Sequence, residues 1–482
     1  IEAARGDWIL VLDADERLTP EGARELRRAV ARADFDCGML PLHNASRIDA
    51  PFEEVVAGRS RIGEVAYLPR LFRRTADLRY SGIVHENVGE WLFRGKRRAR
   101  LLTGIDIVHL GVIPDIRQRR DKSRRNVALL ERACGLEPQD PCNWGYLAFE
   151  LLESGDAARA REAADAGFGA LTAGNPTSDL AALRLTVARA WLEVQSGEVE
   201  GARETLAIGV RAAGEHPDVH FILGCIAEIE ALKSDALERR HASLLEALGH
   251  QAAALACDSG LYLQKFIDGS SGWAAEIRQG TALLLLGRVE ESRRAFERAL
   301  AVNPNAREAA WGRAEAILVG GDPRGALREV QPHLDERPDG WTIAALAAGV
   351  AGSVDAMATW LGRAQSVLPA GFLAPSRRER YADGLATLAL LLGREIDAPG
   401  PIGVLATLVH SNASTPAKGT VRGLEDPLVA ALVRGLLRSW LGRGMTDKVE
   451  RLLSPQAEAS LPGLGAMIAE VVGALEQRER VR

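Results

Sequence analysis

The chain is poor in cysteine, lysine and aromatic residues, and it lacks long apolar runs. Its five cysteines are odd in number and form no CxxC pair (Cys37, Cys134, Cys142, Cys225 and Cys257). This pattern indicates neither a zinc site nor a disulfide framework. The longest purely aliphatic run, Ala282 to Leu286, is too short to cross a bilayer. We therefore expect a protein that is not transmembrane and has no cysteine-based cross-links.

The chain also lacks an excess of charge of one sign. Its 60 Lys and Arg residues are mixed with 65 Asp and Glu residues, and the formal net charge is -5. Nucleic-acid binding requires a clustered basic excess, so we expect no nucleic-acid partner. The chain opens with neither the basic nor the apolar segment that marks a secreted protein, which predicts a cytoplasmic location.

The length of the chain indicates more than one domain. Its 482 residues exceed what a single hydrophobic core usually serves. The first residue is Ile1 and not Met, and an apolar strand is predicted from Trp8 onward. We therefore expect the chain to begin inside a domain.

Residues 1–112 have the pattern of an α/β domain. Trp8 to Leu12 is a continuous apolar run, as expected of a strand that is covered on both faces. Thr19 is a candidate N-cap and Pro20 a candidate first helical residue. The predicted order is therefore strand, acidic turn, helix.

The rest of the chain has a helical pattern. We predict a connecting helix over residues 113–135 and a helical repeat region over residues 136–482. Three pairs of residues recur at a spacing of 34, the period of tetratricopeptide helix hairpins: Ala282 and Ala316, Gly287 and Gly321, and Pro304 and Pro338. The expected architecture is a solenoid of stacked hairpins, and an irregular α-helical bundle is the alternative.

An acidic pair follows the first predicted strand. Asp13 and Asp15 would lie at the carboxyl edge of a sheet, where open α/β folds bind ligands. Carboxylates are hard ligands for Mg²⁺ or Mn²⁺, and a metal held there can bind diphosphate oxygens. The alternative is that the pair only caps a helix.

Four segments together resemble a known family. Ala4 to Glu16 is similar to the DxD region of family 2 glycosyltransferases with the GT-A fold. Leu68 to Arg73, Tyr80 to Glu86 and His109 to Gly111 follow in the order seen in bacterial members that carry tetratricopeptide repeats behind the catalytic domain. The expected fold class is thus a partial GT-A α/β domain followed by an all-α, tetratricopeptide-like repeat region.

The resemblance implies roles for residues that match the family's motifs. Asp15 resembles the metal-binding carboxylate and Asp13 the one that faces the ribose or diphosphate of the nucleotide. Glu86 resembles the general base of an inverting transfer, and His85 would orient it or be the base itself. His109 is a candidate metal or diphosphate contact, and the alternative is a histidine satisfied within the core.

Basic residues near these motifs are candidates for the diphosphate. Arg70 and Arg73 flank the family-like pair Leu71 and Phe72, and Lys122 and Arg125 lie further along the chain. Guanidinium and ammonium groups stabilise the charge that develops on a leaving group. The expected ligands are Mg²⁺ or Mn²⁺ and a nucleoside-diphosphate sugar as the donor.

The family's first strands and helices, which bind the nucleotide base, have no counterpart in this chain. We therefore expect residues 1–112 to be the C-terminal half of a GT-A domain in an N-terminally truncated chain. The predicted activity is transfer of a sugar, with inversion, to a peptide, glycan or lipid-linked glycan acceptor. The repeats would dock that acceptor or a protein partner.

Two other functions compete with this prediction. Haloacid-dehalogenase-type phosphohydrolases also carry two aspartates after an apolar strand, but they require Thr or Val where this chain has Arg17. The stronger rival is a non-catalytic, protein-binding repeat scaffold that carries a truncated GT-A remnant. The sequence leaves the donor sugar, the acceptor and the oligomeric state open.

Overall fold

The structure is a computed structural model of the chain. It describes residues 1–481 with gaps, and every statement below concerns the described residues alone. The gaps are residues 33, 64, 81–87, 89–90, 93–94, 112, 114–121, 235, 258–264, 368–376, 378–379, 382–383, 385–423, 454 and 461.

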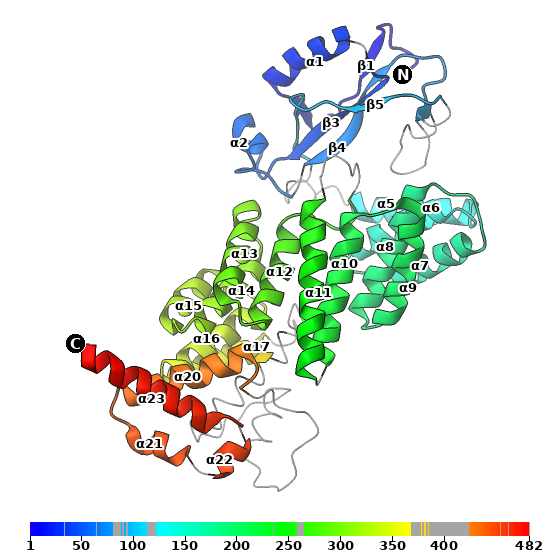
Figure 1. Cartoon of the computed structure of the whole chain (residues 1–482). Coiled ribbons are helices and arrows are strands. Elements are labelled where there is room, and N and C mark those ends of the chain that lie inside the picture. Colours follow the sequence, from blue (N-terminus) through cyan, green and yellow to red (C-terminus); the bar gives the residue numbers. More distant parts are fainter. Residues whose placement is uncertain are drawn as a thin grey trace. The chain divides into compact units, whose positions relative to one another are not determined.

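The N-terminal region holds one mixed sheet of short strands (Figure 1). The strands are β1 (Trp8–Leu10), β2 (Glu16–Leu18), β3 (Cys37–Asn44), β4 (Ala66–Arg73), β5 (Ala99–Leu101) and β6 (Ile107–His109). The order is β1-β4-β3-β6-β2, and β5 pairs with β3 beside β6. The contacts of β3 with β5 and β6 are parallel, whereas the other pairs are antiparallel.

Apolar side chains pack on both faces of this sheet. On one face, Leu40, Leu71 and Ile107 are buried beneath α1 (Pro20–Arg32). On the other face, Phe72 lies edge-to-face with the ring of Trp91. Successive residues of a strand point to opposite faces, so Leu71 and Phe72 enter different clusters. These two apolar clusters fix the sheet, and they therefore also fix the turns that connect its strands.

The predicted strand, turn and helix are present, with one difference. Thr19 accepts a hydrogen bond from the Gly22 N–H at 3.0 Å, which confirms it as the cap of α1. The first strand, however, ends at Leu10, and Leu12 is 39% exposed. A second short strand, β2, stands between the acidic turn and α1 because residues Glu16–Leu18 pair with β6.

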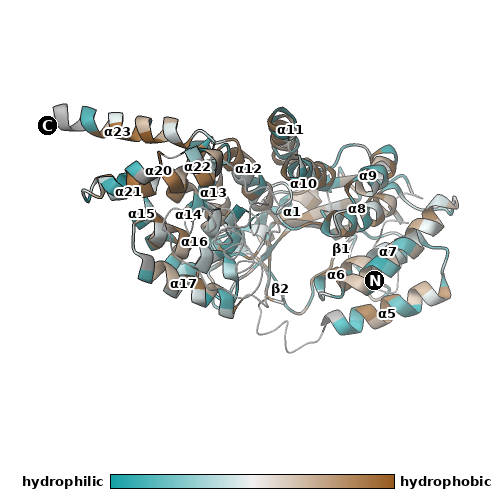
Figure 2. Ribbon diagram, turned by 90° about the horizontal axis from the view of Figure 1, so that it is seen from below, coloured by the Kyte–Doolittle hydropathy of each residue, from teal (hydrophilic) through white to brown (hydrophobic). Residues whose placement is uncertain are grey.

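The remaining described elements are helical, apart from short connections. In order along the chain they are α5 (Lys122–Leu136), α6 (Pro141–Glu153), α7 (Ala157–Thr172), α8 (Asp179–Gln195), α9 (Val199–Ala213), α10 (Pro217–Lys233), α11 (Leu237–Ala256), α12 (Trp273–Leu285), α13 (Val289–Val302), α14 (Arg307–Val319), α15 (Pro323–Val330), α16 (Pro338–Val350), α17 (Val354–Ser366), α20 (Pro427–Leu441), α21 (Thr446–Arg451), α22 (Pro455–Ser460) and α23 (Leu464–Val481). A further short helix, α2 (Phe52–Val56), lies beside the sheet. Hydrophobic and hydrophilic residues alternate along the array (Figure 2), as expected of amphipathic helices.

The repeat of 34 residues is visible as a repeated helix hairpin. The pair α12 and α13 is followed by α14 and α15, and both hairpins turn at a glycine with positive φ, 74° at Gly287 and 89° at Gly321. Glycine adopts this conformation without the steric cost that a side chain would add. The glycines that recur in the sequence therefore mark the same point of each hairpin.

Close packing within the repeats depends on small residues around Phe296. This ring belongs to α13 and is fully buried. A methyl group added to Gly280 of α12 would lie 2.9 Å from the ring, and one added to Gly312 of α14 would overlap it. Glycine at both positions is what lets one aromatic ring fill the space between three helices.

The chain divides into two compact units. Unit 1 comprises residues 1–227 and 249–275, and unit 2 comprises residues 228–248 and 276–482. The helix α11 is shared, because its first part belongs to unit 2 and its last part to unit 1. The predicted boundary at residue 112 marks a change of secondary-structure class and lies within unit 1. No helix in the described part of the chain is long and apolar enough to cross a membrane.

Candidate functional site

Polar residues line up across three neighbouring strands of the sheet. Asn44 of β3 and His109 of β6 are partners in the parallel register, and His109 in turn pairs with Glu16 of β2. Asp13 and Asp15 lie in the turn that leads into β2. The short strand β2, which the sequence did not predict, is therefore what carries the acidic turn to His109.

The side chains of Asp15 and His109 face each other. His109 Nε2 lies 3.7 Å from Asp15 Oδ2, and both side chains are 16% exposed. The other ring nitrogen, Nδ1, lies 2.8 Å from Asn44 Oδ1. The backbone N–H of Leu110 donates to the Asp15 carbonyl at 2.9 Å, which fixes the turn against the end of β6.

Gly111 leaves the space into which these two side chains project. A methyl group added there would lie 2.6 Å from His109 Nε2 and would overlap Asp15 Oδ2. A side chain at this position would therefore displace both groups. The segment His109 to Gly111 thus contains both a histidine that can bind a metal and the glycine whose missing side chain leaves space for the imidazole ring.

Arg70 holds the acidic turn from β4. Its guanidinium donates to Asp13 Oδ2 at 3.0 Å and to Glu16 Oε1. The Glu16 side chain is 1% exposed and also accepts a hydrogen bond from the Asp13 backbone N–H at 3.0 Å. Arg70 thus neutralises a buried carboxylate, whereas Asp13 remains 60% exposed beside it.

The other predicted residues are not all brought to this place. Arg73 pairs with Trp8 at the opposite end of β1, where it lies 4.9 Å above the indole ring and 3.3 Å from Asp36. Arg125 is exposed on α5. Lys122 is the first residue of that helix, but its side chain lies outside the described residues. His85 and Glu86 also lie outside them.

The arrangement suits a divalent cation that keeps open positions. Among the described residues, no group of three or more His, Cys, Asp or Glu side chains could hold a metal. Asp15 and His109 offer one oxygen and one nitrogen, 3.7 Å apart. Mg²⁺ in nucleotide-dependent enzymes is commonly held by one or two carboxylates together with phosphate oxygens and water, and Asp15 supplies one such carboxylate. The residues present therefore fit a metal that is shared with a diphosphate.

A second polar site is built entirely within unit 2. Arg377, Arg380 and Tyr381 are buried, and they meet carboxylates from neighbouring helices. Arg380 lies 2.5 Å from Glu315 Oε1, and the Tyr381 hydroxyl donates to Glu315 Oε2 at 3.0 Å. Arg377 lies 3.6 Å from Asp339. Such buried pairs are costly to break because they leave an uncompensated charge.

Next to these residues lies a small charged pocket. It encloses about 270 Å³, including its open side, and is lined by Glu228, Arg278, Thr281, Leu285, Glu308, Arg377 and Arg380. Arg278 lies 3.9 Å from Glu228 and 3.6 Å from Glu308. Burial raises the pKa of Glu228 in spite of Arg278. Burial acts in the same direction on Glu308, but Arg278 and Arg377 outweigh it and lower the pKa of that carboxyl.

The sequence predicted neither this pocket nor the place of Asn44 in the first site. The pocket residues are widely spaced Arg and Glu residues in a chain that is 26% charged, and only the stacking of helices brings them together. Asn44 is the last residue of the buried strand β3, and the sequence did not single it out as a site residue. Its position at a strand end was the available signal.

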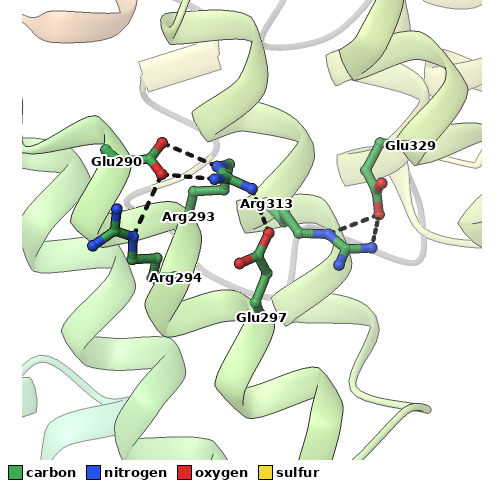
Figure 3. A network of polar contacts seen from close by, with 6 residues as sticks. All are labelled: Glu290, Arg293, Arg294, Glu297, Arg313 and Glu329. Carbon is green, nitrogen blue, oxygen red and sulfur yellow. Dashed lines mark hydrogen bonds and ion pairs between the residues drawn. The ribbon is translucent and has the colours of Figure 1, made fainter.

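The outer surface of the repeats carries a different kind of ionic contact. Figure 3 shows Glu290, Arg293 and Glu297 of α13 in one network, with Arg293 2.6 Å from Glu290 and 2.5 Å from Glu297. Arg313 and Glu329 form a second pair that joins α14 to α15. Arg294, also drawn in Figure 3, contacts Glu290, and the side chains in the α13 network are 37% to 64% exposed, so these pairs contribute little to stability.

Comparison with known proteins identifies the repeats. The tetratricopeptide repeat family model matches residues 277–340. A TPR repeat-containing protein of Synechococcus elongatus is 32% identical over 166 residues, which are 32% of this chain and 37% of that protein. The SPbeta prophage-derived glycosyltransferase SunS of Bacillus subtilis is 26% identical over 141 residues, which are 29% of this chain and 30% of that protein. The matches thus span about a third of the length of these relatives.

Solved structures with similar helices include a thermophilic TPR protein of Thermus thermophilus and the type IV pilus biogenesis factor PilW. The first has a TM-score of 0.34 at 17% identity and covers 48% of this chain and 99% of that protein. The second has a TM-score of 0.35 at 16% identity and covers 49% and 95%. From the family match and the sheet, the chain contains tetratricopeptide repeats behind a small strand-containing region, and the assignment of that region to the GT-A fold stays a prediction.

Proposed function

We propose that the repeat region binds a polypeptide segment, so that the chain is a scaffold for a protein partner. The observation that carries this proposal is the charged pocket between α10, α12 and α14, which lies within and beside the matched repeats. Tetratricopeptide arrays offer grooves between stacked helices, and peptides bind there by presenting side chains to pockets.

The size and lining of the pocket favour a single side chain as its occupant. The volume of about 270 Å³ includes open solvent, and the space between the lining side chains themselves holds about one water molecule, so only the polar tip of a side chain fits. Five of its seven lining residues are charged. A polar or charged group in the pocket could form hydrogen bonds with Glu228 and Arg278 in place of the water that they lose on burial.

Selection from a peptide library displayed on phage, with the whole chain as bait, tests the scaffold. Enriched peptides are expected to bind the Arg278→Ala variant at least about tenfold more weakly, since a buried charged contact is worth on the order of 2 kcal/mol or more. Arg294→Ala is the matched control, because Arg294 is 64% exposed on α13. Failure to enrich any peptide, or equal binding to both variants, would contradict the proposal.

A second candidate function, sugar transfer, is favoured by the facing pair Asp15 and His109. It is supported by the similarity to a glycosyltransferase over part of its length and by the acidic turn at the sheet edge. In this function Asp15 and His109 would hold Mg²⁺ or Mn²⁺, and a bound metal would supply positive charge to a diphosphate leaving group.

The residues of the chain would then have separate tasks. Asp13 is exposed and held at 3.0 Å by Arg70, so it is placed to accept hydrogen bonds from a ribose or from water on a diphosphate. Arg70 itself shapes the turn. Glu86, or His85, is predicted to accept the proton of the acceptor hydroxyl. If both functions hold, the bound polypeptide is the acceptor.

Donor turnover by the protein with Mn²⁺ tests this second function. The expected result is release of nucleoside diphosphate that is lost in Asp15→Asn and Glu86→Gln. Arg73→Ala is a useful comparison, because its pairing with Asp36 at the far end of β1 predicts nearly unchanged turnover. Turnover that survives in both acidic-site variants would exclude the assignment.

A further inference from the structure

We infer that Asn44 is a positioning residue for a metal ligand: it sets the tautomer and the orientation of His109. This inference rests on the second proposed function, in which His109 and Asp15 hold a divalent cation. Its contribution passes through the imidazole ring, because its side chain is hydrogen-bonded to His109 Nδ1.

The backbone places Asn44 where it can do this. The last residue of β3 and the last residue of β6 are partners in the parallel register. The Ala45 backbone N–H also donates to the His109 carbonyl at 2.9 Å. Backbone hydrogen bonds of the sheet therefore hold the two residues side by side, independently of the contact between their side chains.

The hydrogen bond between the side chains decides which ring nitrogen carries the proton. Asn44 Oδ1 has no proton, so the His109 Nδ1–H donates to it across 2.8 Å. In the neutral ring, Nε2 then carries a lone pair, and it is this atom that lies 3.7 Å from Asp15 Oδ2. In the second proposed function, a divalent cation would bind both of these atoms.

Partners of this kind are general in metal sites. A ligating histidine almost always donates its other N–H to an oxygen, which fixes the ring and makes the ligand more basic. Without Asn44, the proton could reside on Nε2 and block the metal-binding lone pair. Gly111 supports the same geometry by leaving room for Nε2.

The first measurement uses the metal-free chain labelled with ¹⁵N-histidine, and His109 is assigned by comparison with His109→Gln. The wild-type ring is expected to show the Nδ1–H tautomer. Asn44→Ala should shift the signal toward the Nε2–H tautomer, whereas Asn44→Asp should keep the original form because a carboxylate also accepts from Nδ1. An unchanged tautomer in Asn44→Ala would overturn the inference.

The second measurement is the affinity for Mn²⁺ alone, taken from the electron paramagnetic resonance signal of the free ion. Asn44→Ala should weaken binding about 10-fold to 100-fold, and Asn44→Asp should recover most of it. Asn126→Ala is the control, because it removes a 3.0 Å hydrogen bond to Glu150 in the helical region.

Mn²⁺ binding by the wild type and by Asn44→Ala tests the metal site and the role of Asn44 separately. If the wild type binds Mn²⁺ and Asn44→Ala binds it equally well, the positioning role is wrong and the proposed metal site survives. If the wild type does not bind Mn²⁺, the proposed metal site is wrong and the role of Asn44 in metal binding is wrong with it.

Discussion

Among single residues, Arg70 is expected to have a large effect on stability. It neutralises Glu16, whose side chain is 1% exposed. Arg70→Ala would leave that carboxylate buried and uncompensated, so we expect the free energy of unfolding to fall by about 3 kcal/mol. Urea denaturation would measure the change.

The comparison variant is Arg47→Ala. Arg47 pairs with Asp49 at 3.3 Å, but its side chain is 54% exposed, and such surface pairs contribute about 0 to 1 kcal/mol. Equal effects of Arg70→Ala and Arg47→Ala would show that burial does not decide the strength of these ion pairs.

Two carboxyls of the pocket in unit 2 should respond to pH with opposite signs. The pKa of Glu228 is raised by burial above its usual value of 4.5. The folded state therefore holds this proton more tightly than the unfolded state, and stability is lost as pH rises above 4.5. Glu228→Gln should raise the free energy of unfolding at about pH 7 by on the order of 1 kcal/mol, and the gain should vanish toward about pH 4.

Glu308 provides the opposite case in the same pocket. Arg278 and Arg377 outweigh burial and lower its pKa, so its stabilising effect is present above the usual value of 4.5 and is lost as pH falls through the lowered value. Glu308→Gln should therefore destabilise the protein at neutral pH and have little effect in acid. Chemical denaturation across this pH range measures both variants. If both substitutions changed the free energy of unfolding at neutral pH in the same direction, the opposite pKa shifts of the two carboxyls would be refuted.

The sequence supported some residues of the first site and could not reveal others. Asp13, Asp15 and His109 stand out because strand ends carry ligands in α/β folds. The partnership of Arg70 with Glu16 depends on the pairing of β1 with β4 and on the turn between β1 and β2. The contact between Asn44 and His109 depends on the register of β3 and β6. No local pattern specifies such registers, because they are set by the fold as a whole.

Among secondary-structure elements, the fit of Phe296 between three helices is the most testable. Gly312→Ala would place a methyl group into the buried ring, so we expect the free energy of unfolding to fall by about 2 kcal/mol. Thermal denaturation followed by circular dichroism measures this.

Gly362→Ala is the control for that variant. Gly362 lies in α17 of the same unit with nothing near its added methyl group. Alanine should stabilise this helix by up to about 1 kcal/mol. A gain in both variants would mean that the ring of Phe296 has room to move.

Helices were easier to predict than strands. The 34-residue period locates the hairpins because each recurring glycine ends a helix in the same conformation, as Gly287 and Gly321 do. The strand β2 has only three residues and exists through its pairing with β6. A strand this short has no periodicity of its own to detect.

For the whole molecule, the shared helix α11 should couple the two units. Gly249 is exposed in this helix, at the point where unit 2 gives way to unit 1. Gly249→Pro would remove a helical hydrogen bond and cost about 3 kcal/mol. Amide exchange should then accelerate on both sides of the substitution, in residues 237–248 and in residues 250–256.

Gly249→Ala should have the opposite effect, because alanine favours the helix by about 1 kcal/mol and nothing lies near the added methyl group. Exchange that accelerates in Gly249→Pro on one side alone would show that α11 does not transmit stability between the units. Hydrogen–deuterium exchange with mass spectrometry resolves the two sides.

The division of α11 also means that the chain passes between the units more than once, since residues 228–248 belong to unit 2 and residues 249–275 return to unit 1. A protease that cuts between residues 227 and 228 would therefore release no separate domain. The C-terminal fragment would keep residues 249–275, which are packed within unit 1, and the two fragments should migrate together until they are denatured. Residues 249–275 would thus keep the two fragments together through contacts that lie within unit 1.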